Sequence, residues 1–264
     1  MQNKYYIMTH NTVELFKELV KIEVNLKIQR YSRGRPVSLT FDDAWNSILL
    51  VLRTGMQWRC LVPKTASYIT VFKTMHSWMN NNIFQTAYTK LLRLYRRRRR
   101  PNHYCVDSTH VKNVYGRNCK GRNHADRGRM STKLSAVVDD KGIPFAFHVA
   151  PGNASDMKLL LPSLQAMLLS VEKGTEVFAD KGYDSKSNRS VCRDMGFKDR
   201  ILKRKCKHSR RTHSRRIVVE HYFSWHDKYR RLILRYEQKI ETYLEFTFLS
   251  AGLLLGRRIS IGHV

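Results

Sequence analysis

Three acidic residues stand in stretches of the chain where an unbound carboxylate is costly. Asp107 lies in a segment that alternates polar and apolar residues, and Asp180 directly follows the short run Glu176–Ala179. Glu220 lies beside two valines in a segment with helical spacing. Carboxylates that converge from separate elements are the oxygen ligands that Mg²⁺ prefers, and they can hold two ions for an in-line displacement at phosphorus. Each acid taken alone could instead be a helix cap or one half of an ion pair.

The charge of the chain bears on that choice. The 264 residues include 49 Lys and Arg against 21 Asp and Glu, a formal net charge of +28. Such an excess predicts a polyanionic partner, and nucleic acid is the first candidate. An anionic membrane surface would require a basic amphipathic helix with a free apolar face, and the sequence has no clear one. We therefore expect a nucleic acid partner and no membrane partner, with the three acids serving phosphate chemistry.

Composition also limits where the protein acts. The chain is 42% hydrophobic, enough for a sizeable core. No apolar run reaches the roughly 18 residues of a membrane span, and the first ten residues lack the layout of a secretion signal. The five cysteines form no C-x-x-C pair, which favours reduced thiols in an intracellular compartment. We expect a cytoplasmic protein that is not secreted.

Residues 1 to about 95 are predicted to be mostly helical. Apolar residues recur at helical spacing over Val13–Ile28. Thr40 is a plausible N-cap of a second helix that stops near Gly55, and a third helix is expected over Ser67–Met79. Two helices joined by a Gly turn in a basic setting suggest a helix-turn-helix-like module, and a plain small helical bundle fits equally well.

A run of five arginines, Arg96–Arg100, is closed by Pro101. This run predicts a solvated basic linker over residues 96–103, with Arg97, Arg98 and Arg99 available to phosphates. The linker would separate a helical domain, residues 1–95, from a second domain, residues 104–264.

The second domain is expected to combine strands and helices. Strands are predicted at Tyr104–Val114, Thr132–Val138, Ile143–Ala150, Glu176–Ala179 and Asp199–Leu202. Helices are predicted at Asp156–Glu172, Lys186–Met195, about Ser214–Tyr236 and Glu241–Arg257. Asp156 and Asp184 are interpreted as caps of the helices that follow them. A hairpin followed by alternating strands and helices indicates an α/β fold with a mixed sheet and helices on its faces.

Four separated motifs, in order along residues 35 to 256, resemble a known family. They are Val106-Asp107-Ser108-Thr109; Ser131–Asp156 with Lys133, Gly142 and Pro151-Gly152; Ala179-Asp180-Lys181-Gly182-Tyr183-Asp184; and Arg216-Ile217-Val218-Val219-Glu220 followed by Tyr229-Arg230-Arg231-Leu232 and Arg235-Tyr236-Glu237. The N-terminal Leu52-Arg53-Thr54-Gly55 with Trp58 is also similar to the helical module that precedes such motifs. The chain resembles the DDE transposases of bacterial insertion sequences, of the insertion-sequence-four/five supergroup.

The resemblance implies an RNase H-like catalytic core in which Asp107, Asp180 and Glu220 bind two Mg²⁺ or Mn²⁺ ions. It implies cleavage of double-stranded DNA at transposon ends and strand transfer into target DNA, by a homo-oligomer on DNA near the bacterial nucleoid. Arg216 lies one helical turn before Glu220 and would contact a phosphate. The sequence departs from relatives at Asp227, where a basic residue is usual and where Lys228 lies one position off.

Basic residues outside the acids are expected to bind the DNA backbone. The predicted contacts are Arg216, Lys228, Lys203, Arg204, Lys205, Arg210, Arg211, Arg215, Arg117, Lys120, Arg122, Arg97, Arg98 and Arg99. Two alternatives stay open from sequence. The first is a sequence-specific DNA-binding protein whose catalysis has decayed, which the departure at Asp227 motivates. The second is an RNase H-like nuclease that does not join strands.

Overall fold

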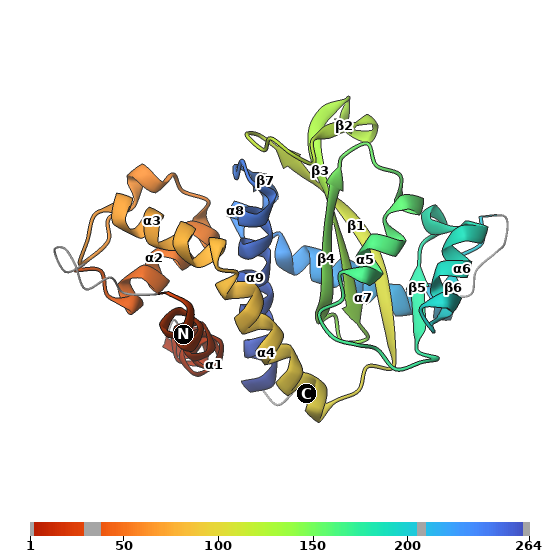
Figure 1. The fold of residues 1–264 in the computed structure, drawn as a ribbon, viewed down its shortest axis with the longest axis horizontal. Coiled ribbons are helices and arrows are strands. Elements are labelled where there is room, and N and C mark those ends of the chain that lie inside the picture. The colour runs from red at the N-terminus through yellow and green to blue at the C-terminus, as the bar shows by residue number, and fades with distance from the viewer. Residues whose placement is uncertain (1–2, 29–37, 205–209, 261–264) are drawn as a thin grey trace. The chain divides into compact units, whose positions relative to one another are not determined.

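The protein is described by a computed structural model that places residues 3–28, 38–204 and 210–260. The chain divides into two compact units (Figure 1). Unit 1 contains residues 1–98, 228–233 and 241–264, and unit 2 contains residues 99–227 and 234–240. The units differ from the predicted division in one respect, because segments beyond residue 227 belong with the N-terminal helices. Among the described residues, every helix is too short or too polar to cross a membrane.

Unit 1 is built from helices at both ends of the chain. Its elements are α1 (Asn3–Lys27), α2 (Phe41–Thr54), the 3₁₀ turn η1 (Trp58–Cys60), α3 (Tyr68–Asn80), α4 (Ile83–Arg98), α8 (Arg230–Ile233) and α9 (Ile240–Ser260). The predicted caps of α2 are confirmed: the Thr40 side chain accepts from the Asp43 amide, and Gly55 ends the helix with φ 68°. Ser67 caps α3 in the same way. Whether these helices form a helix-turn-helix-like module stays a prediction.

Aromatic and aliphatic side chains fill the core of unit 1. Trp45 of α2 and Phe16 of α1 are buried, with ring centroids 6.2 Å apart. Phe16 also lies flat against Gly252 of α9, where any side chain would collide with its ring. From α9, the buried Glu245 carboxylate accepts backbone N–H bonds at the start of α4. The two ends of the chain are thus joined in one core.

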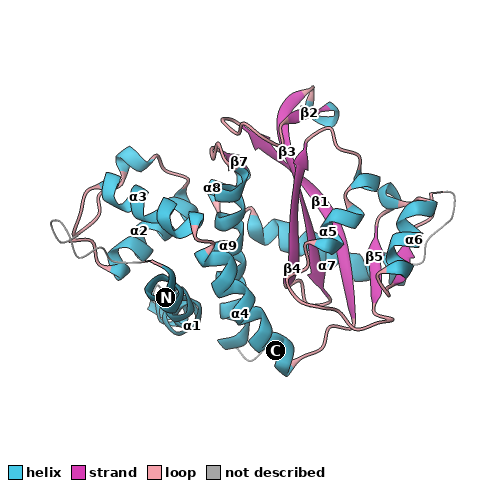
Figure 2. Cartoon of the chain, viewed as in Figure 1, coloured by secondary structure: helices cyan, strands magenta, loops and turns pink. Residues whose placement is uncertain are grey.

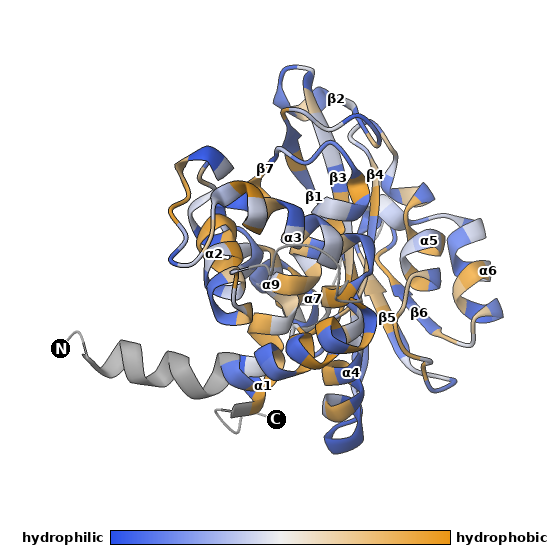
Figure 3. Cartoon of the chain, turned by 60° about the vertical axis from the view of Figure 1, so that its left-hand side comes forward, coloured by the Kyte–Doolittle hydropathy of each residue, from blue (hydrophilic) through white to orange (hydrophobic). Residues whose placement is uncertain are grey.

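The helix α4 extends further than the sequence predicts. Arg96, Arg97 and Arg98 form its last turn instead of a linker, because the buried stripe that includes Tyr95 continues to that point. Figure 3 shows this end of α4 as hydrophilic. The linker prediction holds only after Arg98, and Arg99 already belongs to unit 2.

Unit 2 is centred on a mixed sheet. Its strands are β1 (His103–Asn113), β2 (Gly121–Asn123), β3 (Arg129–Asp139), β4 (Pro144–Pro151), β5 (Glu176–Ala179), β6 (Lys198–Ile201) and β7 (Leu234–Arg235). The main path runs β2-β3-β1-β5-β6, with β4 also paired to β3 and β7 to β1. β1, β3 and β4 are antiparallel neighbours, whereas β5 and β6 run parallel to β1. This is the mixed α/β sheet expected of an RNase H-like core.

Helices cover both faces of this sheet (Figure 2). They are α5 (Leu160–Gln165), α6 (Lys186–Asp194) and α7 (Arg210–His226), with short 3₁₀ turns η2 (His124–Asp126), η3 (Asp156–Lys158) and η4 (Lys181–Tyr183). The thiol of Cys105 on β1 points at α7, where it donates to the carbonyl of Arg215. On the other face, Ser135 of β3 bonds to Ser163 of α5. Because strand side chains alternate between faces, these contacts fix which face each β1 residue occupies.

Two predicted helices are wrong in length. The helix expected over Asp156–Glu172 is reduced to η3 and α5, because the backbone N–H of Leu168 instead donates to the carbonyl of Phe145 on β4. The helix expected to reach Tyr236 ends at His226, and residues 234–235 form β7. In both segments apolar residues follow a helical spacing, but tertiary hydrogen bonds determine the backbone path.

Candidate active site

Asp107 lies on β1, and Asp180 directly follows β5, the parallel strand next to it. Val106 of β1 is paired with Ala179 of β5, and each acid directly follows one of these two residues in the chain. Asp107 has the same facing as Cys105, toward α7, and Asp180 follows the alternation of β5 toward the same side. The spacing of the two acids is therefore set by backbone hydrogen bonds.

Arg216 of α7 connects the two acids. Its guanidinium lies 3.1 Å from Oδ1 of Asp180 and 3.5 Å from Oδ2 of Asp107. The Arg216 side chain is 7% exposed, and its buried Nε has no hydrogen-bond partner among the described residues. α7 is held in place here by the bond from Cys105 to the neighbouring carbonyl. The two carboxylates together make a positive charge favourable at this position, and the buried Arg216 guanidinium supplies it.

Burial raises the pKa of Asp107 to about 6. The carboxylates of Asp180 and Asp156 raise this pKa further, while the Ser108 amide, 2.8 Å from Oδ1, and the Arg216 guanidinium lower it. The Asp107 carboxylate thus lies in an environment that penalises negative charge and rewards a cation.

Glu220 lies on α7, one turn after Arg216, and is exposed. The spacing places both residues on one face of the helix, as predicted. Within the described ranges, no three acidic, His or Cys side chains are close enough together to hold a metal ion. The structure therefore brings Asp107 and Asp180 together through Arg216, and leaves Glu220 one turn away on the same helix.

A second polar cluster lies behind Asp107 on the α5 face of the sheet. Oδ1 of Asp156 accepts from Ser108 Oγ at 2.9 Å and from Lys133 Nζ at 2.8 Å. The predicted capping role of Asp156 is wrong, since Ser155 occupies the N-cap position of η3. Gly182, two residues after Asp180, packs against the Asp156 carboxylate so closely that an added Cβ would lie 3.2 Å from Oδ2. The contact between Lys133 and Asp156 was not predicted, because Lys133 stands out in the sequence only as a family-like position and Asp156 as a cap.

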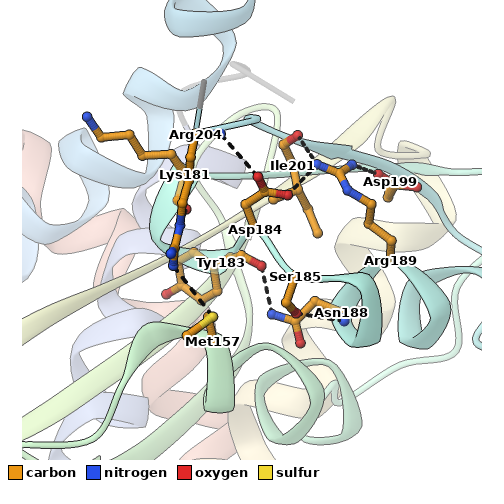
Figure 4. A network of polar contacts seen from close by, with 10 residues as sticks. All are labelled: Met157, Lys181, Tyr183, Asp184, Ser185, Asn188, Arg189, Asp199, Ile201 and Arg204. Atoms are coloured by element: carbon orange, nitrogen blue, oxygen red, sulfur yellow. Dashed lines mark hydrogen bonds and ion pairs between the residues drawn. The ribbon is translucent and has the colours of Figure 1, made fainter. Parts of the chain in front are cut away.

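The segment after Asp180 is held by an ionic network (Figure 4). Asp184 accepts from Arg189 at 2.8 Å and from the backbone amide of Arg204 at 3.1 Å. Arg189 also pairs with Asp199 on β6. The predicted capping role of Asp184 is wrong, because Ser185 caps α6 through the Asn188 amide. Asp184 instead joins the turn after the second acid to the start of the basic segment at residue 203.

The basic residues predicted to contact DNA differ in how they are engaged. Arg204 is exposed, and its Nε donates to the Lys181 carbonyl at 3.3 Å. Arg215 lies over the Phe178 ring and pairs with Glu176 at 3.1 Å. Lys205 lies outside the described residues, as do the side chains of Arg210 and Arg211.

The remaining predicted contacts differ in exposure. Arg99 is engaged with Asp140 at 2.5 Å and is mostly covered. Lys228 is exposed but lies beyond the end of α7, in unit 1. Exposed side chains in the described structure are found at Lys203, Arg117, Lys120, Arg122, Arg97 and Arg98.

The residues at this site suit a hard divalent cation by their chemistry. Asp107 and Asp180 supply carboxylate oxygens, and the Arg216 guanidinium already lies where positive charge is favoured. The donor set contains no thiolate or imidazole that would favour a softer metal.

Comparison with known proteins identifies the family. The model of the family described as "Transposase DDE domain" matches residues 98–255, more than half of the chain. The chain belongs to the DDE transposase family. A putative transposase for insertion sequence element IS402 of Burkholderia cepacia is 32% identical to this transposase over 53% of the chain and 70% of the relative.

The chain is also similar to two further proteins. The transposase for insertion sequence element IS1106 of Neisseria meningitidis serogroup B is 33% identical over 39% of the chain and 38% of the relative. A cryo-EM structure of the piggyBac transposase synaptic complex with hairpin DNA superposes with a TM-score of 0.48 at 12% identity, covering 96% of this transposase and 75% of that chain.

Proposed function

We propose that this transposase cleaves DNA at the ends of its element and transfers the freed strands into target DNA, using Asp107, Asp180 and Glu220 as the acids that hold two divalent ions, Mg²⁺ or Mn²⁺. One observation carries the proposal. Asp107 and Asp180 each follow a residue of the paired strands β1 and β5, and both contact Arg216, which lies one turn before Glu220 on α7. When bound, the ions would stabilise charge on the phosphate and promote deprotonation of the attacking oxygen.

The residues of the chain supply alignment and charge. In the first step the oxygen of water attacks phosphorus, the bond to the 3′ oxygen breaks, and a 3′-hydroxyl is released. In the second step that hydroxyl attacks a target phosphorus, so one phosphodiester bond forms as another breaks. Both are in-line displacements, so the same three acids can serve both. Arg216 partly offsets the charge of Asp107 and Asp180 before substrate binds, and its guanidinium is placed to meet a phosphate oxygen afterwards.

DNA binding by the chain is supported by the family and by the charge of +28. We propose that exposed cations, including Arg117, Lys120, Arg122 and Lys203, contact the backbone of double-stranded DNA. The two ends of an element must be joined to one target, so we also propose that the protein acts as a homo-oligomer on DNA in the bacterial cytoplasm. The division into a DNA-binding helical region, residues 1–95, and a catalytic region, residues 104–264, remains part of this proposal.

The test uses the full chain and a plasmid that carries the inverted repeats flanking its gene. With Mg²⁺ or Mn²⁺, the natural sequence should cut at the repeats and yield joined products. Asp107→Asn should abolish cleavage and leave the mobility shift of the same DNA unchanged, because the substitution removes a ligand and leaves the basic surfaces intact. Asp194→Asn, an exposed acid on α6, is the matched control and should cut normally.

Three outcomes would overturn the proposal. Cleavage that survives in Asp107→Asn would remove this acid from the site. Binding by the natural sequence with no cleavage in either metal would identify a decayed DNA-binding protein. Cut but never joined strands would identify a nuclease.

A further inference from the structure

The connection between β1 and β3 forms a basic arm, residues 112–129. Its exposed cations are Lys112, Arg117, Lys120, Arg122, Arg127 and Arg129. Its single acid, Asp126, pairs with Arg129 at 3.4 Å, and the described structure shows no ion pair for Arg117, Arg122 or Arg127. Figure 3 shows the chain around β2 as largely hydrophilic. The arm thus presents several cations whose charge no nearby acid offsets.

The arm has a fixed backbone, unlike a typical exposed loop. β2 within it pairs with β3, from Gly121↔Ser131 to Asn123↔Arg129. At its base the Gly116 amide donates to the side chain of Asn113 at 2.7 Å. The Val114 amide donates at 3.0 Å to the carbonyl of Arg235. A surface that holds its shape before binding loses less entropy when it meets a ligand.

A fully buried arginine holds the base of the arm. Arg235, 0% exposed, donates through Nη1 to the carbonyl of Asn118 at 2.6 Å and to Oγ1 of Thr132 at 3.0 Å. Its Nε donates to the carbonyl of Glu237 and its Nη2 to that of Gln238, each at 3.1 Å. The planar guanidinium therefore joins the segment after β1, at Asn118, to the segment after β7, at residues 237–238, through backbone oxygens.

The close approach at this position leaves space only for glycine. A Cβ added at Gly116 would lie 2.6 Å from Cζ of Arg235 and 2.7 Å from Nδ2 of Asn113. Burying a guanidinium is expensive unless its hydrogen bonds are satisfied. The buried hydrogen bonds of Arg235 offset this cost, and they fix the backbone at the base of the arm.

The arm stands at a defined distance from the proposed reaction centre. β1 runs without interruption from Asp107 to Asn113, and Lys112 is five residues beyond Asp107. At about 3.3 Å per residue, the base of the arm lies about 17 Å along the strand from that acid. Because each strand of B-DNA advances about 3.4 Å per base pair, this distance corresponds to about five base pairs.

We infer that the basic arm is a preformed contact surface for the sugar–phosphate backbone of duplex DNA, with its base about 17 Å, the length of about five base pairs, from the proposed reaction centre, and that Arg235 is the positioning residue that sets its shape. The distance from the cut rests on the proposed function, since Asp107 marks the reaction centre. The contact extends the proposed DNA binding to one defined surface, and its test does not depend on cleavage activity.

The test is the salt dependence of DNA binding by the full chain, measured in a chelator so that no cleavage occurs. Fluorescence anisotropy with a random-sequence duplex of about 30 base pairs, between about 50 and 200 mM salt, gives the slope of log affinity against log salt. The arm variant carries Arg117→Gln, Arg122→Gln and Arg127→Gln. The control variant removes the same charge at the opposite edge of the sheet, with Lys186→Gln, Arg193→Gln and Lys198→Gln.

Each lost phosphate contact removes about 0.9 from the slope, so the arm variant should lose about 2.7. At about 0.1 M salt that loss corresponds to two to three decades of affinity. The control should keep the natural slope. An arm variant with the natural slope, or a control that loses as much, would overturn the inference. Because binding is measured in a chelator, a failed cleavage assay leaves this result standing.

The positioning role has its own test, in variants that keep every exposed charge. Arg235→Lys retains the buried charge without the fork of donors. Thr132→Val, a milder change, removes one acceptor of Arg235 and the bonds of the Thr132 hydroxyl with Cys119 and Asn113. Both should speed amide exchange over residues 113–119 and weaken DNA binding about tenfold with the slope retained. If exchange speeds up in Thr132→Val while affinity stays natural, Arg235 does not position the arm for DNA.

Discussion

Glu245 should make the stability of unit 1 depend on pH. Its carboxylate on α9 is 2% exposed and accepts from the amides of Phe84 at 2.9 Å and Gln85 at 3.3 Å, at the start of α4. Burial raises the pKa of Glu245 to about 8, from 4.5 in an exposed chain, against the opposing effect of the two amides and of Lys27. The folded protein therefore holds a proton here that the unfolded chain has lost.

The sign and size follow from this difference. Between pH 4.5 and 8 the native state binds one more proton than the unfolded state, so the free energy of unfolding falls as pH rises. One proton gives a slope of at most about 1.4 kcal/mol per pH unit, or roughly 5 kcal/mol over the whole window. The contribution is complete below about pH 4.5 and lost above about pH 8. Glu245→Gln does not titrate, so its stability should lack this slope.

Urea unfolding followed by tryptophan fluorescence measures the effect, since Trp45 and Trp78 are buried in unit 1. The quantity to plot is the stability of the natural protein minus that of Glu245→Gln, which cancels other titrations. Glu241→Gln, an exposed glutamate on the same helix, is the charge-matched control and should give a flat difference. A flat difference for Glu245→Gln as well would mean that Glu245 stays ionised when buried, and the reasoning would fail.

Three further changes test other parts of the fold. Gly55→Ala should lower the free energy of unfolding by about 1 kcal/mol or more, because φ at this residue is 68° and the new Cβ would lie 3.2 Å from the side chain of Arg230. A thermal melt that matches that of the natural protein would contradict this. In a Cys206→Ser background, a thiol reagent should label exposed Cys60 quickly and Cys105 only on unfolding, since burial raises the pKa of Cys105 to about 12; equal rates would refute it. Asp43→Ala should lower the free energy of unfolding by about 2 kcal/mol at neutral pH, because the Lys64 and Thr65 amides lose their acceptor. Hydrogen bonds lower the pKa of Asp43 below 3.8, so the difference between the variant and the natural protein should shrink in acid.

Local signals allowed much of the fold to be predicted. The strand Glu176–Ala179 has the predicted bounds, because a short apolar run before a charged turn has few other solutions. Thr40 and Gly55 are confirmed as caps, since capping depends on the residue itself. The hairpin around Gly142 is also confirmed, because β3 and β4 pair as antiparallel neighbours on either side of it. Glycine suits this turn, since φ at Gly142 is 72°. Alignment of Asp107 with Asp180 also follows once both are placed on adjacent parallel strands.

Features that depend on distant partners could not be predicted. Arg235 lies in a sequence that suggests an exposed helix, and its burial depends on the carbonyl of Asn118 and the hydroxyl of Thr132, over a hundred residues away. The role of Asp156 was hidden in the same way, because the Lys133 amine and the Ser108 hydroxyl reach it from two different strands. The spacing of polar residues in the sequence does not indicate which distant groups they will contact.

The joining of both chain ends in unit 1 has a consequence for synthesis. A ribosome releases α1–α4 early, but α9 emerges only after all of unit 2 has been made. Until then Phe16 lacks the surface around Gly252, and Tyr88 lacks Phe248. Products truncated before Ile240 would expose these rings and invite proteolysis. The core of unit 1 would therefore close only once α9 has been made.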